Sequence, residues 1–380
     1  MLETISRRGA PSPGVRTDLE TARQMLGEEL LGHLASLAPA LRDDVLEALS
    51  VEGKLLHQPT SALDGRWALL PFCLADDLYA GVDQVYARGA ALAMECVVCA
   101  TDLFDDVMDE DVTPLSERLG TARMLNVALT LISLAQRVLL ALVTHDPSAT
   151  LPVGMLDAVQ QALLLASAGQ QQDLLAERRL ACDLSREECL EIAASKAGSL
   201  LSLACRLGAM CAGVDELRIS QCAEMGRLLG IAAQLDNDAH DLSHLLQSSG
   251  SQKSDLKRGK KTLPVVLAAH SLRETHGLDA ERVDKALQRV ALSIPEASER
   301  AIAALREGIL TTWGVSLLYR ERAGDYAREI TDNRPLSLAL CQVLGLAETL
   351  AENKMGSMGD MGGNRCVVQV ENASVSGAGC

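Results

Sequence analysis

The chain has 380 residues, of which 48% are hydrophobic and 23% are charged, so it can bury at least one large core. Its formal net charge of −16 excludes nucleic acid as the main partner, because phosphate backbones are bound by broad cationic surfaces. Alanine and leucine are abundant, aromatic residues make up only 2%, and β-branched residues are sparse. This composition favours helices, and we expect an all-α protein that folds as a single large helical bundle.

In chain order, residues 1–18 contain Pro, Gly and Arg and are predicted to form a flexible leader. Apolar residues then recur with a helical period over residues 19–350, which we predict to be one all-α domain. Residues 351–380 are rich in Gly and Ser and are predicted to be a flexible tail. The final Cys380 lacks the standard four-residue prenylation signal, so we do not expect a lipid on it.

The chain contains eleven cysteines, an odd number without a disulfide-type spacing, and its first residues lack the apolar core of a signal peptide. We therefore expect reduced cysteines and a cytoplasmic protein. The most apolar segment, residues 124–143, is interrupted by Asn126, Gln136 and Arg137. We expect it to fall short of a membrane-spanning helix, and we expect no transmembrane segment.

Residues 102–111 hold six carboxylates in ten positions, directly after an apolar run that is predicted to be a buried helix. Asp105, Asp106 and Asp109 have the spacing that places three side chains on one arc of a helix. Like charges at this spacing repel, and acids near a helix C-terminus also oppose the helix dipole. The alternative is a solvated acidic helix end, but the buried run before it favours a cleft that holds a cation.

A second polar cluster, Asn237, Asp238 and Asp241, repeats the spacing of the first after another apolar helix. Two such oxygen-rich clusters facing each other suit magnesium, which keeps several waters and shares its coordination sphere with phosphate oxygens. His240 and His244 could instead suggest zinc, but they point around the helix from the aspartates and no third soft ligand is evident.

A concentrated basic segment follows in this acidic chain, and it is either a solvated loop or a site for anionic oxygens. Its cations are Lys253, Lys257, Arg258, Lys260 and Lys261. Two acidic helix faces, a metal and a basic loop together would hold a diphosphate group and make it a leaving group.

The motifs "DDVMD", "NDAHD" and "SDLKRGKKTLP", in this order, resemble the trans-isoprenyl diphosphate synthase (polyprenyl synthetase) family over about residues 55–350. Gly169, Gln170 and Asp173 resemble the family's Gly-Gln-x-x-Asp, and Lys196 resembles the lysine of its diphosphate-binding Lys-Thr-Gly. The resemblance implies an all-α bundle of the isoprenoid synthase type, Mg²⁺ as the cofactor, an allylic prenyl diphosphate as the substrate and a homodimer.

The resemblance also implies roles for individual residues. Metal binding falls on the two acidic clusters, and Asp105, Asp106, Asp109 and Lys196 become the catalytic residues. Substrate contacts fall on Gln170, Asp173, Lys196, Lys257, Arg258 and Lys260. Bulky residues four and five positions before the first aspartate form the tunnel floor in the family. Here these are the small Thr101 and Ala100, which predicts a long-chain donor.

The family's site for isopentenyl diphosphate looks altered in this sequence. Family members that elongate chains use a Gly-Lys-x-x-Arg-Pro segment and two arginines after the first acidic motif. We align the segment with Gly65, Arg66 and Pro71, and the two arginines fall on Pro114 and Leu115.

Three functions therefore compete. A prenyltransferase, whose acceptor the sequence does not identify, is the leading hypothesis, and Arg66, Arg118 and Arg123 could compensate for the missing arginines. A class I terpene cyclase needs no second diphosphate, but the scarcity of aromatic residues argues against a cation-lined cavity. A non-catalytic regulatory subunit is the third alternative, and the intact acidic motifs argue against it.

Overall fold

Helices form nearly all of the described chain, as the composition predicts, and no strand occurs among the described residues. The computed structural model describes residues 18–58, 64–79, 83–145, 150–247, 255–292, 294 and 299–344. Its α-helices are α1 (Leu19–Leu34), α2 (Pro39–Ala48), α3 (Arg66–Leu78), α4 (Gln84–Met108), α5 (Pro114–His145), α6 (Leu151–Ala176), α7 (Arg186–Ala193), α8 (Ser199–Ala212), α9 (Glu216–Gln247), α10 (Asp255–Arg258), α11 (Leu263–His276), α12 (Ala280–Ala291), α13 (Glu299–Ile330) and α14 (Leu338–Leu344). A 3₁₀ turn, η1 (Ala181–Asp183), precedes α7, and a π-helical turn, η2 (Ala194–Gly198), joins α7 to α8.

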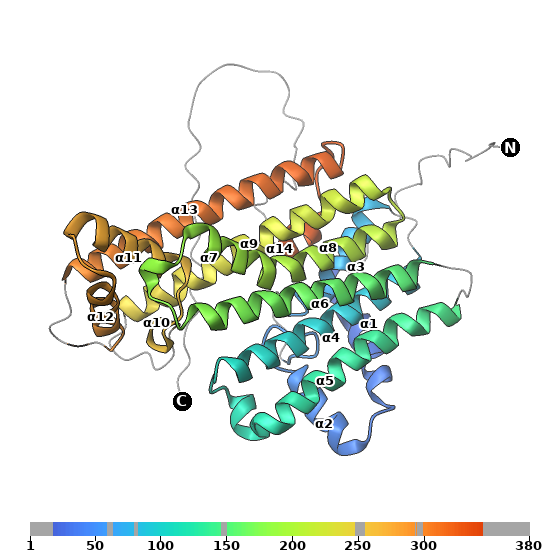
Figure 1. Ribbon diagram of the computed structural model, residues 1–380. Helices are drawn as coiled ribbons and strands as arrows, with labels where there is room; N and C mark the ends of the chain where they lie inside the picture. Colours follow the sequence, from blue (N-terminus) through green and yellow to red (C-terminus); the bar gives the residue numbers. More distant parts are fainter. Residues whose placement is uncertain are drawn as a thin grey trace, which may run out of the picture.

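The long helices pack side by side in one bundle (Figure 1). Helix α4 packs against α3, α5 and α8, and α8 packs in turn against α6 and α9. Helix α13 covers α9 along the upper edge in Figure 1, and α10, α11 and α12 gather at one end of the bundle. The all-α single bundle is therefore confirmed.

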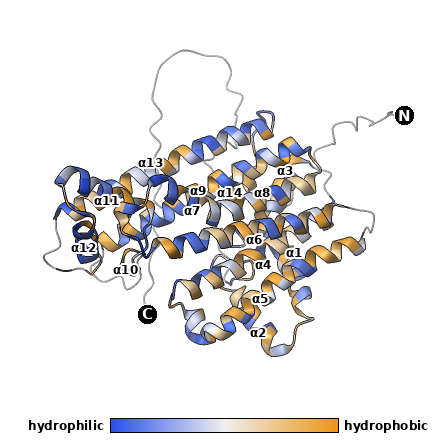
Figure 2. Ribbon diagram, viewed as in Figure 1, coloured by the Kyte–Doolittle hydropathy of each residue, from blue (hydrophilic) through white to orange (hydrophobic). Residues whose placement is uncertain are grey.

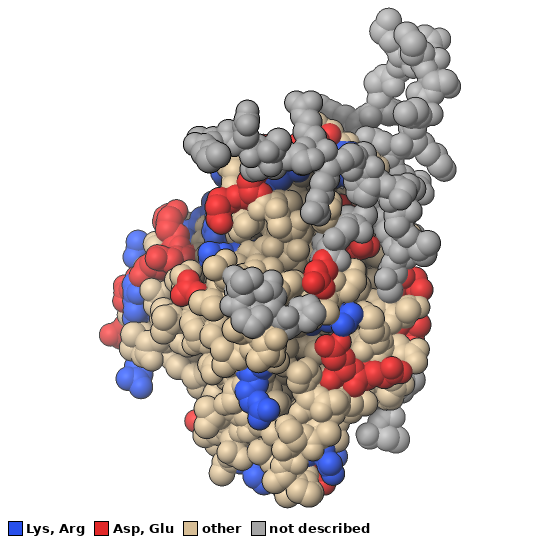
Figure 3. All heavy atoms as spheres, turned by 90° about the vertical axis from the view of Figure 1, so that its right-hand side faces the viewer, with Lys and Arg blue, Asp and Glu red and all other residues tan. Residues whose placement is uncertain are grey.

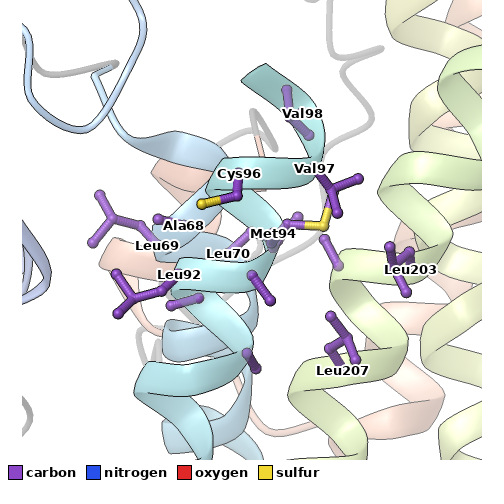
Figure 4. Close-up of a cluster of buried hydrophobic side chains, with 14 of the residues drawn as sticks. Ala68, Leu69, Leu70, Leu92, Met94, Cys96, Val97, Val98, Leu203 and Leu207 are labelled. Carbon is purple, nitrogen blue, oxygen red and sulfur yellow. The ribbon is translucent and has the colours of Figure 1, made fainter. Parts of the chain in front are cut away.

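Helix α4 forms much of the core because its middle turns, residues 89–100, are almost entirely apolar. Residues 89–100 of this helix are all buried. Met94 and Val97 lie among side chains of α3 and α8, such as Leu69 and Leu207 (Figure 4). A helix that is apolar all round must be covered on all faces, and the fold supplies this cover from three neighbouring helices.

Three described helices are long and apolar enough to cross a membrane by length and composition alone: residues 114–144, 151–176 and 299–330. The expectation that residues 124–143 fall short was wrong by this criterion, because Asn126 and Gln136 are uncharged and Arg137 is a single charge in a very apolar run. Figure 2 shows hydrophobic residues along much of α5 and α6, whereas α12 is mostly hydrophilic. In the bundle, part of each apolar window is buried against other helices.

The predicted leader and tail fall almost entirely outside the described residues. The first described residue, Asp18, caps α1 by accepting a hydrogen bond from the Thr21 N–H at 3.0 Å. The last described helix, α14, ends at Leu344.

Candidate active site

The first acidic cluster lies at the C-terminal end of α4, where the buried run ends. Asp105 and Asp106 lie in the last turn, and Asp109 is the C-cap residue. Cations compensate the unfavourable end of the helix dipole here, because the side chain of Arg258 reaches both Asp109, at 2.8 Å, and Asp111, at 2.5 Å.

Asp109 is buried and is the most heavily contacted of these carboxylates. It pairs with Lys260 and Arg258, and it accepts a long hydrogen bond of 3.5 Å from the Gln170 side-chain amide. Burial alone would raise the pKa of Asp109, but the hydrogen bonds and charges of Lys260 and Arg258 outweigh it, and the pKa is lowered. Asp109 is therefore held ionised.

Lys196 occupies the middle of the π-helical turn η2 and contacts carboxylates from two other helices. Its ammonium group lies 2.7 Å from Asp173 of α6 and 3.5 Å from Asp105 of α4. Burial would lower the pKa of Lys196, yet the two carboxylates raise it overall. Burial raises the pKa of Asp105 even though Lys196 opposes the shift. Lys196 thus stays charged in a partly dry site.

Two glycines allow η2 to approach its neighbours closely enough to place Lys196. A Cβ atom added at Gly169 of α6 would lie 2.7 Å from the Ser195 Cβ and 2.9 Å from the Lys196 backbone nitrogen. A Cβ atom added at Gly230 of α9 would lie 2.5 Å from the Ala197 carbonyl oxygen. The wide turn is therefore clamped between α6 and α9, and π-turns inside helices frequently occur at functional sites.

The second acidic cluster lies on α9, and its members differ in burial. Asp238 is buried and accepts a hydrogen bond of 2.9 Å from Gln234, whereas Asn237 is exposed. Burial raises the pKa of Asp238 to about 7, and the nearby carboxylates Asp255 and Asp173 act in the same direction. Asp241 accepts a hydrogen bond of 3.0 Å from the Asp255 N–H.

A pocket opens between α6, η2, α9 and the segment around α10, and it brings the predicted residues together. Asp238 and Asp255 line one part, and Asp173, Lys196 and Lys260 line another. Asp105 and Asp109 reach the pocket through their ion pairs with Lys196 and Lys260. Apolar side chains, among them Ile192 and Leu263, complete the wall.

The donor set fits a hard divalent cation and an anionic ligand together. Among the described residues, no three His, Cys, Asp or Glu side chains converge into a ready-made metal site, since the lysines and Arg258 contact the carboxylates. However, the buried Asp238 faces two further carboxylates, and the buried Gln170 side-chain oxygen lacks a hydrogen-bond partner. A cation would relieve this excess of negative charge, and the carboxylate oxygens of Asp238, Asp255 and Asp173 are donors that suit a hard cation.

Comparison with known proteins now decides the family. The model of the polyprenyl synthetase family matches residues 68–296, which is more than half of the chain. The chain belongs to the polyprenyl synthetase family.

Curated relatives of the chain are named as isoprenyl diphosphate synthases or as a prenyltransferase. The (2E,6E)-farnesyl diphosphate synthase of Mycobacterium tuberculosis (strain ATCC 25618 / H37Rv) is 30% identical over 235 residues, 60% of this chain and 62% of that protein. The tryptophan prenyltransferase ComQ of Bacillus spizizenii is 28% identical over 172 residues, 45% and 54% of the two chains. The chain spans about six tenths of the length of the curated relatives it matches.

A solved polyprenyl synthetase from Streptomyces coelicolor A3(2) has the same fold. It aligns with a TM-score of 0.66 and 26% identity, and the alignment covers 88% of this chain and 98% of that chain. The all-α isoprenoid synthase bundle predicted from the motifs is therefore present.

Three residues in or near the candidate site were missed from the sequence. Asp255 was hidden among the lysines of the basic segment, although an acid in that segment was a signal. Gln234 lies four residues before Asp238 on one helix face, a spacing that could have shown its hydrogen bond. Lys54 is the third.

The alignment of the Gly-Lys segment with Gly65 and Arg66 is not supported by the geometry. Arg66 points away from the acidic clusters and donates hydrogen bonds of 3.0 and 2.7 Å to the Val343 carbonyl. Lys54 follows Gly53 instead, is buried, and pairs with Asp102 on α4, one turn before Asp105. Gly53 and Lys54 therefore offer a Gly-Lys pair that lies closer to the first acidic cluster than Gly65 and Arg66 do.

The other proposed compensators are also engaged elsewhere. Arg118 pairs with Glu47, and Arg123 donates a hydrogen bond of 2.8 Å to Asp44, so both side chains are tied to α2. These contacts direct the two guanidinium groups away from the acidic cluster.

The remaining predicted residues are placed as follows. Lys253 lies outside the described residues, and Lys257 is partly buried on α10 and does not line the pocket. Ala100 is fully buried in the main core, and the Thr101 hydroxyl donates a hydrogen bond of 3.0 Å to the Val98 carbonyl. Neither Ala100 nor Thr101 lines the pocket described above.

Proposed function

We propose that this chain is a Mg²⁺-dependent prenyltransferase that ionises an allylic prenyl diphosphate and transfers the prenyl group to an acceptor. The observation that carries the proposal is the pocket lined by Lys196, Lys260 and Asp238, whose two lysines also pair with Asp105 and Asp109 at the end of α4. Diphosphate is the ligand that needs both a shared metal and fixed cations.

Each residue has a definite task in this reaction. The carboxylates of Asp105, Asp106 and Asp109 would hold Mg²⁺ from one side. Asp238, Asp241 and Asp255 would hold it from the other, and the exposed position of Asn237 gives it less support as a ligand. When bound, the metal neutralises charge on the diphosphate oxygens as a Lewis acid.

Lys196, Lys260 and Arg258 exchange their present carboxylate partners for diphosphate oxygens when substrate enters. The bond between the allylic carbon and its oxygen breaks, and the diphosphate leaves with the electron pair. The acceptor forms the new bond to the allylic carbon and loses a proton. The fixed ammonium and guanidinium groups stabilise the leaving group without reorganising at that moment.

We propose that isopentenyl diphosphate is a poor acceptor. Pro114 and Leu115 replace the family's arginines, and Arg66, Arg118 and Arg123 are held by other partners. Losing two charged hydrogen bonds removes about 3–6 kcal/mol of binding, or roughly a hundred- to ten-thousandfold in affinity. The tryptophan prenyltransferase shows by its name that a relative uses another acceptor.

Assembly and location are further parts of the proposal. Leu125 and Leu129 of α5, together with Val153 and Leu164 of α6, are exposed on the outside of the bundle, which supports a homodimer through these helices. Figure 3 shows a broad uncharged area on the end of the molecule where α5 ends and α6 begins. The nine described cysteines are all free, which supports a cytoplasmic protein.

The test is to incubate the protein with C10 to C50 allylic diphosphates and Mg²⁺, with and without isopentenyl diphosphate, and to identify every product. We expect metal-dependent diphosphate release that falls at least ~10²-fold in Asp105→Ala and in Asp238→Ala. Asp157→Ala, an exposed aspartate on α6, is the matched control. Retained release in both site variants would refute the proposed site.

The products separate the alternatives. A cyclic hydrocarbon formed without an acceptor would identify a class I terpene cyclase, and release only in the presence of a second synthase chain would identify a regulatory subunit. Efficient incorporation of labelled isopentenyl diphosphate at micromolar concentration would restore an ordinary chain-elongating synthase.

A further inference from the structure

A cavity of about 250 Å³ lies between α6, α8 and α9 and borders the turn η2 at Ala194 and Ser195. It shares no lining residue with the pocket described above, which η2 lines with Lys196. The turn therefore separates two cavities. Where this one borders η2, open space replaces the close backbone contacts that confine the turn at Gly169 and Gly230. A side chain has to hold the turn on this side.

Ser199, the first residue of α8, lines this cavity and is bonded to the turn. Its hydroxyl lies 2.6 Å from the Ser195 carbonyl oxygen and 2.9 Å from the Lys196 carbonyl oxygen, and both carbonyls belong to η2. The hydroxyl donates to these oxygens, so one side chain reaches the backbone of the lysine itself.

A serine hydroxyl that bonds to a carbonyl one turn earlier is a common feature of helices. Ser133 of α5 makes such a bond at an exposed position, where water competes for the carbonyl. Ser199 differs in two respects, because it is only 6% exposed and because its partners lie in a π-turn. The bond therefore fixes a part of the backbone whose geometry is not that of a regular helix.

We propose that Ser199 is a positioning residue for Lys196. The inference rests on the proposed function, in which the Lys196 ammonium group contacts the diphosphate. That ammonium group now lies 2.7 Å from Asp173 and 3.5 Å from Asp105. Charge-assisted hydrogen bonds depend on short distances, so a shift of the η2 backbone by a fraction of an ångström weakens the contacts of Lys196.

The cavity makes a conservative rescue possible. Ser199→Ala removes the hydroxyl and leaves the rest of the side chain. Ser199→Thr keeps the hydroxyl, and a threonine in a helix adopts the side-chain rotamer that bonds to a carbonyl one turn earlier. Its additional methyl group has room, because Ser199 borders open space.

The direct test is titration calorimetry of the full chain with inorganic diphosphate in the presence of Mg²⁺. We expect Ser199→Ala to weaken binding about two- to tenfold, which is the effect of one lost hydrogen bond. Ser199→Thr should bind as the wild type does. Ser202→Ala, which removes a hydroxyl from the same cavity three residues later, is the matched control and should also bind normally.

A double-variant cycle separates positioning from a general structural role. In the Lys196→Met background, Ser199→Ala should cause no further loss of diphosphate binding, because the group that Ser199 positions is absent. An equal loss in both backgrounds would overturn the inference. Unchanged binding in Ser199→Ala, or a loss in Ser199→Thr as large as in Ser199→Ala, would overturn it as well.

A second measurement keeps this inference separate from the proposed function. If the wild type binds no diphosphate, the proposed function fails, and urea unfolding of the same four proteins then decides. Because Lys196 pairs with Asp173 without ligand, Ser199→Ala should lower the urea midpoint less in the Lys196→Met background than in the wild type. An equal fall of the midpoint in both backgrounds would show that Ser199 does not act through Lys196.

Discussion

The carboxylate of Asp238 is buried beside Asp255 and Asp173, and this crowding makes the free energy of unfolding depend on pH. Its pKa is about 7 in the folded protein and near 3.8 when unfolded, so the native state binds the proton more tightly. The stability that protonated Asp238 contributes is present at low pH and is lost as the pH rises from about 4 to 7.

We predict that Asp238→Asn removes this loss in metal-free protein. The difference in unfolding free energy between the variant and the wild type should grow in favour of the variant as pH rises from 4 to 7, by up to about 4 kcal/mol for a full three-unit shift. Urea unfolding at several pH values measures it. If the difference in unfolding free energy between Asp238→Asn and the wild type stays constant from pH 4 to 7, the raised pKa of Asp238 is contradicted. Glu274→Gln, at an exposed position, is the control.

Ala100 lies on α4 one turn before Asp105 and is wholly buried in the main core. We predict that Ala100→Phe lowers stability by ~1–3 kcal/mol, because a ring must be accommodated in a packed region. If the prenyl tunnel passes this residue, the same variant should also prefer shorter allylic donors. The ratio of kcat/KM values for long and short donors measures this, and an unchanged ratio in a folded variant would place the tunnel elsewhere.

At the scale of elements, the π-turn η2 is the part of the site that the sequence could not reveal. The helical period expected over residues 19–350 gives no sign of a wide turn at residues 194–198, where α6 and α9 pack closely against the chain. The acidic end of α4 was predictable, because an apolar run followed by spaced acids is a local signal. Lys196 was named only through the resemblance to the family. The partners of Arg66, Arg118 and Arg123 were not, because each is a tertiary contact across different helices.

We predict that Gly230→Ala displaces η2 and lowers both stability and turnover. The new methyl group would lie 2.5 Å from a backbone oxygen and 2.6 Å from the Gly198 Cα, so backbone must move, at about 1–3 kcal/mol. Gly32→Ala, an open helical site on α1, should instead stabilise the protein by about 0.5–1 kcal/mol. Thermal unfolding measures the change in stability, and diphosphate release measures the change in turnover. A Gly230→Ala variant with the stability and turnover of the wild type would show that the close contact between α9 and η2 is not needed.

At the scale of the whole molecule, the three longest apolar helices lie at the surface of the bundle, and each exposes leucines. The composition predicted one helical bundle correctly, since so many apolar residues at helical spacing have no other way to be buried. It could not show which apolar faces stay outside, because burial depends on how the helices are arranged.

We predict that the melting temperature rises with protein concentration. Association through the proposed α5 and α6 faces would stabilise the folded state by mass action, so each tenfold increase in concentration should raise the melting temperature by roughly 1–3 °C. Differential scanning calorimetry between 1 and 100 μM measures this. A constant melting temperature would show that the exposed leucines bind no second copy.

The outward leucines of α5 and α6 also link the fate of the chain to its abundance in the cell. If the proposed homodimer forms, a newly made copy exposes these leucines until it meets another copy, and during that interval they are available to chaperones, proteases and aggregation. A modest fall in synthesis would then lower the steady-state amount of folded protein more than proportionally.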